Sequence, residues 1–269
     1  MLSLHRIPNR RWGCYASLLV AFVATTPLYA AELGFTTIFS ADMQDYASCV
    51  TSDSAGNTYV AGLTYSPRFP VTPGVVQTTW GGAKDAFVAK LGPDGKVIWA
   101  TYLGGMYDDQ ATGIKVDSGG NVIVTGQTIS PDFPVSHAVR PTITDGTTYA
   151  LAFLTKLDPT GTHLIYSTYI DPSRGLALDA AGNAYVAGLS SVTKFTPEGA
   201  LAYSFRHAYT FYTNVEDHVA EGGIAVDSAG AAYVAGTGPR GGDHMLGSDP
   251  RSCRTSVPPK STSRRPPIV

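Results

Sequence analysis

The chain has 269 residues, and only 15% of them are charged, against about 25% in an average protein. Gly (29 residues) and Tyr (15 residues) are abundant, a balance that favours a turn-rich β protein over a helical one. Residues 31–238 contain 10 Lys and Arg and 19 Asp and Glu, a balance of −9. An acidic body of this kind argues against nucleic acid as a partner.

The first thirty residues predict a signal peptide, residues 1–30. Arg6, Arg10 and Arg11 precede an apolar run from Tyr15 to Val23, and Ala30 ends the segment with a small residue. This order is typical of a cleaved secretory leader, and the apolar run is too short for a membrane-spanning helix. We therefore expect cleavage after Ala30. The mature chain is expected to be secreted, on the cell surface or periplasmic, with no membrane span.

A ten-residue phrase occurs four times. It reads DSAGNTYVAG from Asp53, DSGGNVIVTG from Asp117, DAAGNAYVAG from Asp179 and DSAGAAYVAG from Asp227. The Asp side chain can close an Asx turn, and the Gly allows a left-handed backbone, so each copy predicts a β-hairpin. One carboxylate per copy is poor ligation for calcium. The predicted structural turn residues are Asp53, Gly56, Asn57, Asp117, Gly120, Asn121, Asp179, Gly182, Asn183, Asp227 and Gly230.

A second predicted hairpin follows the phrase in three of the units. The segments Ala86–Gly105, Ala152–Ile170 and Val192–Phe205 each contain Lys, an apolar residue and then a Pro-x-Gly turn. Two hairpins make four antiparallel strands, which is one blade of a β-propeller. We expect an all-β fold of three full blades, at 45–105, 109–170 and 171–207, with a partial blade at 219–238, so that the β-propeller repeat domain spans 31–238.

The combination DSAGNTYVAGLT, FPV, DAFVAKL, PDG and ATYLGG closely resembles a bacterial β-propeller repeat named for seven-bladed propellers, the SBBP repeat. The resemblance covers roughly Phe35 to Gly238. It implies a repeat protein that is exported or on the cell surface, in a family whose members often have many blades and added adhesive modules. It implies nothing definite about an activity.

The long connections that contain Phe69-Pro70-Val71 and Phe133-Pro134-Val135 are candidate binding loops, because long connections on a rigid scaffold tend to carry function. Within these loops we expect Phe69 and Phe133 themselves to pack onto their own blades, in preference to contacting a ligand. The third unit lacks this connection. Lys90, Lys156 and Lys194 recur at one strand position, and we expect them on a solvated blade face.

No catalytic constellation is recognisable. The histidines lack metal-ligand spacing, and no nucleophile elbow or phosphate loop occurs. Asp108-Asp109 and Glu216-Asp217 are adjacent carboxylates with no recognisable partner base. Cys49 stands where other copies have Gly, so we interpret it as a small buried residue. We expect no enzyme activity, no metal and no cofactor.

The favoured function is therefore that of an exported, non-catalytic scaffold that binds a protein or a surface glycan. An alternative is a propeller enzyme resembling lyases with similar repeats, which would need ligands or catalytic groups converging from several blades. A third alternative is a non-functional gene fragment.

Two expectations concern the ends of the repeat. Residues 239–269 form a basic tail rich in Ser, Pro and Arg, which predicts disorder, and the abrupt loss of the repeat favours an altered reading frame or a truncated gene. Gly34–Ser40 resembles the last strand of a blade. It would close a four-bladed ring if it joined the sheet around Tyr233. An open arc is preferred, because the family pattern implies more blades.

Overall fold

The computed structural model describes residues 18–22, 33–143, 151–188, 191–206, 223–237 and 243–248, and every regular element in these ranges is a β-strand. None of the described residues forms a helix that is long and apolar enough to cross a membrane. The predictions for residues 1–17, 207–222 and 249–269, including Glu216-Asp217, concern positions outside the described residues.

Three sheets have four antiparallel strands, each in chain order. The first blade contains β3 (Asp45–Ser52), β4 (Thr58–Thr64), β5 (Asp85–Leu91) and β6 (Val97–Leu103). The second contains β7 (Asp109–Val116), β8 (Val122–Thr128), β9 (Leu151–Leu157) and β10 (Leu164–Ile170). The third contains β11 (Ser173–Leu178), β12 (Ala184–Gly188), β13 (Ser191–Phe195) and β14 (Leu201–Arg206). The predicted fold class, all-β with four-stranded antiparallel blades, is confirmed.

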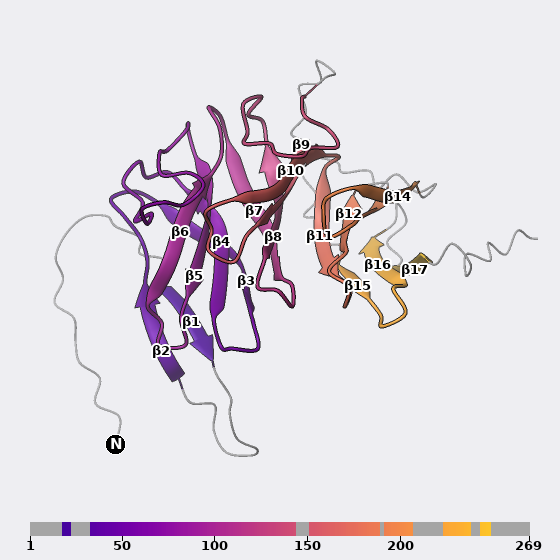
Figure 1. Cartoon of the computed structure of the whole chain (residues 1–269), viewed down its shortest axis with the longest axis horizontal. Helices are drawn as coiled ribbons and strands as arrows, with labels where there is room; N and C mark the ends of the chain where they lie inside the picture. Colours follow the sequence, from indigo (N-terminus) through magenta and orange to yellow (C-terminus); the bar gives the residue numbers. More distant parts are fainter. Residues whose placement is uncertain are drawn as a thin grey trace, which may run out of the picture.

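The last blade is a three-stranded sheet of β15 (Ile224–Val226), β16 (Ala232–Thr237) and β17 (Asp243–Ser248). The blades follow one another in a row, with the first strand of each next to the first strand of the following blade (Figure 1). β17 lies in the segment for which disorder was predicted, so that expectation is wrong for Asp243–Ser248. Strand pairing uses backbone hydrogen bonds, which a segment poor in apolar residues can still supply to the edge of β16.

The arc is open. β2 (Leu33–Ile38) pairs with β1 (Leu18–Phe22), whereas β16 pairs with β15 and β17. The two segments therefore do not share a sheet, and Figure 1 places β2 and β16 at opposite ends of the row. This is the open arrangement that the sequence favoured. β1 is formed by the apolar run of the predicted leader.

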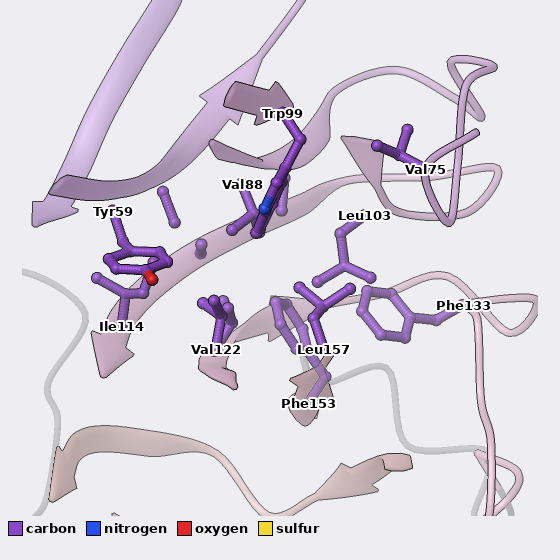
Figure 2. Packing of buried hydrophobic residues seen from close by; sticks show 14 of the residues in the cluster. Tyr59, Val75, Val88, Trp99, Leu103, Ile114, Val122, Phe133, Phe153 and Leu157 are labelled. Carbon is purple, nitrogen blue, oxygen red and sulfur yellow. The ribbon is translucent and has the colours of Figure 1, made fainter. Parts of the chain in front are cut away.

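A large part of the core lies between the first two blades, and a further cluster around Phe69, Phe87 and Tyr102 lies within the first blade. Tyr59 and Val88 of the first blade pack against Ile114, Val122 and Leu157 of the second (Figure 2). All five side chains are almost fully buried. Burying a side chain of this size stabilises the fold by roughly 1.5–3 kcal/mol, so neighbouring blades support one another.

Candidate binding site on the loop face

The two ends of each blade carry different connections. Because neighbouring strands are antiparallel, the turns inside the two hairpins lie at one end, and the longer connections lie at the other. We call these ends the turn face and the loop face. In the first blade the turn face holds residues 53–57 and 92–96. The loop face holds residues 65–84 and the link 104–108 to the second blade.

The repeated phrase forms the turn face. Asp53 Oδ1 accepts hydrogen bonds from the backbone N–H groups of Ala55 and Asn57, both at 2.9 Å, and Oδ2 accepts from Asn57 Nδ2 and the Tyr59 hydroxyl. Gly56 has φ +82°. Burial alone would raise the pKa of Asp53, but these hydrogen bonds outweigh it and lower the pKa. The side chain therefore holds the corner as a carboxylate.

The other copies repeat this geometry. Asp117, Asp179 and Asp227 each accept the backbone N–H groups two and four residues on, at 2.9–3.0 Å. Their glycines all have positive φ. Asn121 and Asn183 add side-chain donors, while the fourth copy has Ala231 and keeps only the backbone pair and the Tyr233 hydroxyl. These residues build turns, and their acceptor groups are already occupied.

The repeated lysines are not on a solvated face, so that expectation is wrong. Lys156 Nζ lies 2.9 Å from Asp117 Oδ2, with the two side chains only 4% and 8% exposed, and it donates to the Pro197 carbonyl of the third blade at 3.0 Å. Lys90 lies over the ring of Tyr59, and Lys194 lies over the ring of Tyr185 with its Nζ 3.4 Å from Asp179 Oδ2. The third blade contacts Lys156, which a single blade pattern does not reveal.

The rings of Phe69 and Phe133 point into the molecule. Phe69 lies 4.6 Å from Phe87 between ring centroids, and Phe133 lies 4.5 Å from Phe153. Both are almost fully buried. Tyr102 Oη accepts the Phe69 N–H and donates to the Ser66 carbonyl. The two rings anchor their loops, so a ligand of these loops would have to contact other residues.

The link between the first two blades is fixed by three consecutive backbone N–H groups. Gly105 donates to Asp109 Oδ2 at 2.7 Å, Met106 to Asp132 Oδ1 at 2.9 Å, and Tyr107 to Ser130 Oγ at 2.9 Å. The acceptors all belong to the second blade and its long loop. The link is therefore rigidly attached to the loop face, which the sequence did not predict.

Two buried carboxylates lie beside this link. Asp85 and Asp109 are fully buried, and an oxygen of each is within 3 Å of the position that a Cβ on Gly104 would take. Burial raises the pKa of Asp85 to about 7, helped by the charges of Asp109 and Asp132, and the pKa of Asp109 to about 6. The carboxylates of Asp85 and Asp109 accept hydrogen bonds from the backbone N–H groups of Gly81 and Gly105. Their role is therefore to stabilise the junction between the first two blades.

Exposed apolar side chains gather around the same link. Met106, Tyr107 and Ile129 are 49%, 48% and 45% exposed. The Ile129 N–H donates to the Asp108 carbonyl, and Tyr107 is bound to Ser130, so the three residues are neighbours. We call Met106, Tyr107 and Ile129 the loop-face cluster. It offers apolar and aromatic contact on a fixed backbone.

The remaining candidates have structural partners. Asp108 pairs with Lys84 at 3.3 Å. The Cys49 thiol donates to the Ala61 carbonyl, and burial raises its pKa to about 12, so it stays protonated at neutral pH. Within the described ranges, no three His, Cys, Asp or Glu side chains come close enough together to hold a metal ion.

Comparison with known proteins agrees with the architecture. Residues 98–134 match the family model described as SBBP, beta-propeller repeat. The matched segment begins in β6 and ends just after Phe133, so the sequence repeat crosses from one blade to the next. Residues 98–134 thus carry a repeat similar to the SBBP type, and the four-stranded antiparallel blades have the architecture of a β-propeller repeat.

Two further similarities were found. The uncharacterized WD repeat-containing protein L264 of Acanthamoeba polyphaga mimivirus is 33% identical over 85 residues, which are 31% of this chain and 6% of that protein. The chain thus matches only a small part of that relative. A crystal structure of a protein of unknown function from Bacteroides caccae has a TM-score of 0.46 and 14% identity, covering 88% of this chain and 70% of that chain.

Proposed function

We propose that this β-propeller repeat protein is an exported, non-catalytic scaffold that binds another protein through its loop face. The observation that carries the proposal is the loop-face cluster of Met106, Tyr107 and Ile129, which is exposed on a link held by three backbone hydrogen bonds. A rigid site loses little conformational entropy when it binds. Met and Tyr are also side chains that protein interfaces favour.

The chemistry of the cluster supports a protein partner over a surface glycan. Met106 and Ile129 present only apolar atoms, which bury well against apolar protein side chains. A glycan surface is dense in hydroxyl groups, each of which needs a hydrogen-bonding partner when it is buried. Tyr107 could stack on a sugar ring, but the side chains of Met106 and Ile129 provide no hydrogen-bonding partners for the sugar hydroxyl groups.

Export rests on the order of basic residues, apolar run and Ala30 in the first thirty residues. N-terminal sequencing of the protein made in a bacterial host, from medium, envelope and cytosol separately, tests it. We expect a chain that begins at Ala31 and is found outside the cytosol. A product that keeps Met1 and occurs only in the cytosol would refute export.

Binding is tested with matched double and single variants. Met106→Ser with Tyr107→Ser removes the apolar surface of the cluster, whereas Ile98→Ser removes a similarly exposed apolar side chain near the turn face. Immobilised chains are probed with solubilised envelope proteins and, separately, with isolated surface glycan. We expect saturable protein binding that falls at least about tenfold, or 1.4 kcal/mol, in the double variant and is unchanged in Ile98→Ser. Equal binding by all three chains, or binding only to glycan, would overturn the assignment.

A further inference from the structure

The outer edges of the first two blades are covered by the chain itself. In the first blade the Thr72 N–H donates to the Ala100 carbonyl of β6 at 2.9 Å, and the Gln77 carbonyl accepts the Tyr102 N–H at 3.2 Å. Thr72 and Gln77 belong to the long loop after β4. This loop therefore occupies hydrogen-bonding groups that the last strand of a blade would otherwise leave open.

The second blade repeats the arrangement. Ser136 exchanges two backbone hydrogen bonds with Ser167 of β10, at 3.0 and 2.7 Å, and the Arg140 carbonyl accepts the Tyr169 N–H at 3.1 Å. A threonine on each outer strand adds a further contact. Thr101 Oγ1 bonds to both backbone groups of Gln77, and Thr168 Oγ1 bonds to both of Arg140. Both threonines are buried beneath the loops.

The third blade has no such loop, because only residues 189–190 separate β12 from β13. Its outer strand is β14, and within the described part of the chain β14 pairs only with β13. Trp99, Tyr166 and Tyr203 pair with the repeated lysines and so define equivalent positions on the three outer strands. Ser204 therefore corresponds to Ala100 and Ser167, whose backbone groups point to the covering loops.

The side chains on this edge differ from those on the covered edges. Phe205 stands where the other blades have Thr101 and Thr168, and it is 45% exposed, whereas the threonines are 0% and 1% exposed. Leu201 at the start of β14 is also largely exposed. The hydroxyl that fastens a covering loop is replaced by an aromatic ring. An occupant of this edge would thus need an apolar side chain near Phe205.

We propose that the outer edge of β14 binds an extended peptide segment of another protein by strand addition, with backbone hydrogen bonds to Ser204 and an apolar contact to Phe205. Strand addition is a general mode of peptide recognition at open sheet edges. The covering loops at β6 and β10 show that the equivalent positions of this fold accept such backbone contacts. The site is separate from the loop-face cluster and does not depend on it.

Hydrogen exchange of the full chain gives the first test. Ser167 N–H is bonded to Ser136, so we expect it to exchange at least about a hundredfold more slowly than Ser204 N–H, whose groups face outward. Protection of Ser204 in the free chain would mean that the chain or a second copy already covers the edge. Either result would overturn the proposal, and analytical ultracentrifugation of the same sample separates the two.

Peptide titration gives the second test. The probe is the synthetic peptide FPVSHAVRP, the sequence of residues 133–141, because this segment covers the equivalent edge of β10. Ser204→Pro removes the outward N–H, which an edge strand tolerates. Ser204→Ala removes only the hydroxyl, which bonds to Thr193. Phe205→Asp keeps the backbone and removes the apolar contact.

We expect the peptide to slow exchange at Ser204, and its affinity to fall at least about tenfold, or 1.4 kcal/mol, in Ser204→Pro and Phe205→Asp but not in Ser204→Ala. Exchange at Val186, which is paired on both sides within the third blade, reports that this blade is folded in each variant. No binding at about 1 mM peptide, where even weak complexes form, would overturn the proposal. Binding that none of the variants weakens would place the peptide elsewhere and would overturn it too.

Discussion

Single side chains in this protein act across blades. Lys156 neutralises the turn carboxylate of Asp117 in its own blade and donates to the Pro197 carbonyl in the next. Position 123 is Ile, where the first and third blades have Tyr59 and Tyr185. Lys156 therefore forms its ion pair without lying over a ring, whereas Lys194 lies over Tyr185 and is also 3.4 Å from Asp179 Oδ2. The same repeat position thus carries an ion pair with or without a ring contact.

Lys156→Ala is expected to lower the free energy of unfolding by about 3 kcal/mol, because it leaves the buried Asp117 carboxylate without its counter-charge. Lys90→Ala is the matched control, since it removes a lysine at the equivalent position that lies over Tyr59 at 5.2 Å and costs only about 0.5–1 kcal/mol. Urea unfolding at pH 7 measures both. Equal losses in the two variants would contradict the assigned ion pair.

Asp85 makes stability depend on pH. Its pKa is raised to about 7 in the folded chain, first by burial and then by the charges of Asp109 and Asp132, against about 3.9 when unfolded. The folded state therefore binds the proton more tightly, and stability is lost as the pH rises from about 4 to about 7. Asp109, with its pKa raised to about 6, adds a loss of the same sign.

Urea unfolding at pH 5.5 and at pH 8 is expected to show a lower stability at the higher pH, by roughly 1–4 kcal/mol. Asp85→Asn keeps an acceptor for the Gly81 N–H but cannot ionise. It should therefore remove most of the difference in stability between the two pH values and stabilise the chain at pH 8. Asp94→Asn, at an exposed turn, serves as the control and should leave the difference unchanged. A wild-type chain that is more stable at pH 8 would refute the sign.

Among the elements, the hairpins were predictable from sequence because their chemistry is local. An Asx turn needs only Asp, Gly and the following backbone N–H groups, and the alternating apolar residues set the strands on either side. The covering loops were not predictable in this way. Their contacts join Thr72 to Ala100 and Ser136 to Ser167, and these pairs carry no sequence signal beyond the length of the loop.

The candidate site was likewise only partly predictable from the sequence. The apolar residues of the loop-face cluster can be read in the sequence, but their exposure depends on hydrogen bonds from Met106 to Asp132 and from Tyr107 to Ser130. The Phe-Pro-Val loops were correctly placed among the long connections, and Phe69 and Phe133 pack onto aromatic rings of their own blades, as expected. Burial against the blade decides which residues of a loop remain available.

At the scale of the whole molecule, the open arc leaves its last blade less covered than the others. Tyr59 and Tyr185 occupy one repeat position and are fully buried, whereas Tyr233 at the same position is 42% exposed. The Tyr185 hydroxyl donates to the Gly230 carbonyl of the following blade. Within the described residues, no further blade lies beyond β15–β17 to give Tyr233 the same cover. Stability should therefore decrease along the row of blades.

Native-state hydrogen exchange should reveal this gradient, because in a repeat protein each blade is stabilised mainly by its neighbours. Amides of β4, β5 and β8 border the large core between the first two blades and should exchange most slowly, those of β12 and β13 faster, and those of β16 fastest. Leu154 is fully buried in the core between the second and third blades. Leu154→Ala should cost about 2–5 kcal/mol at that junction and speed exchange in β12 and β13 while leaving β4 and β5 nearly unchanged. Equal acceleration in all blades would mean that the row unfolds as a single unit, and that stability is not passed from each blade to the next.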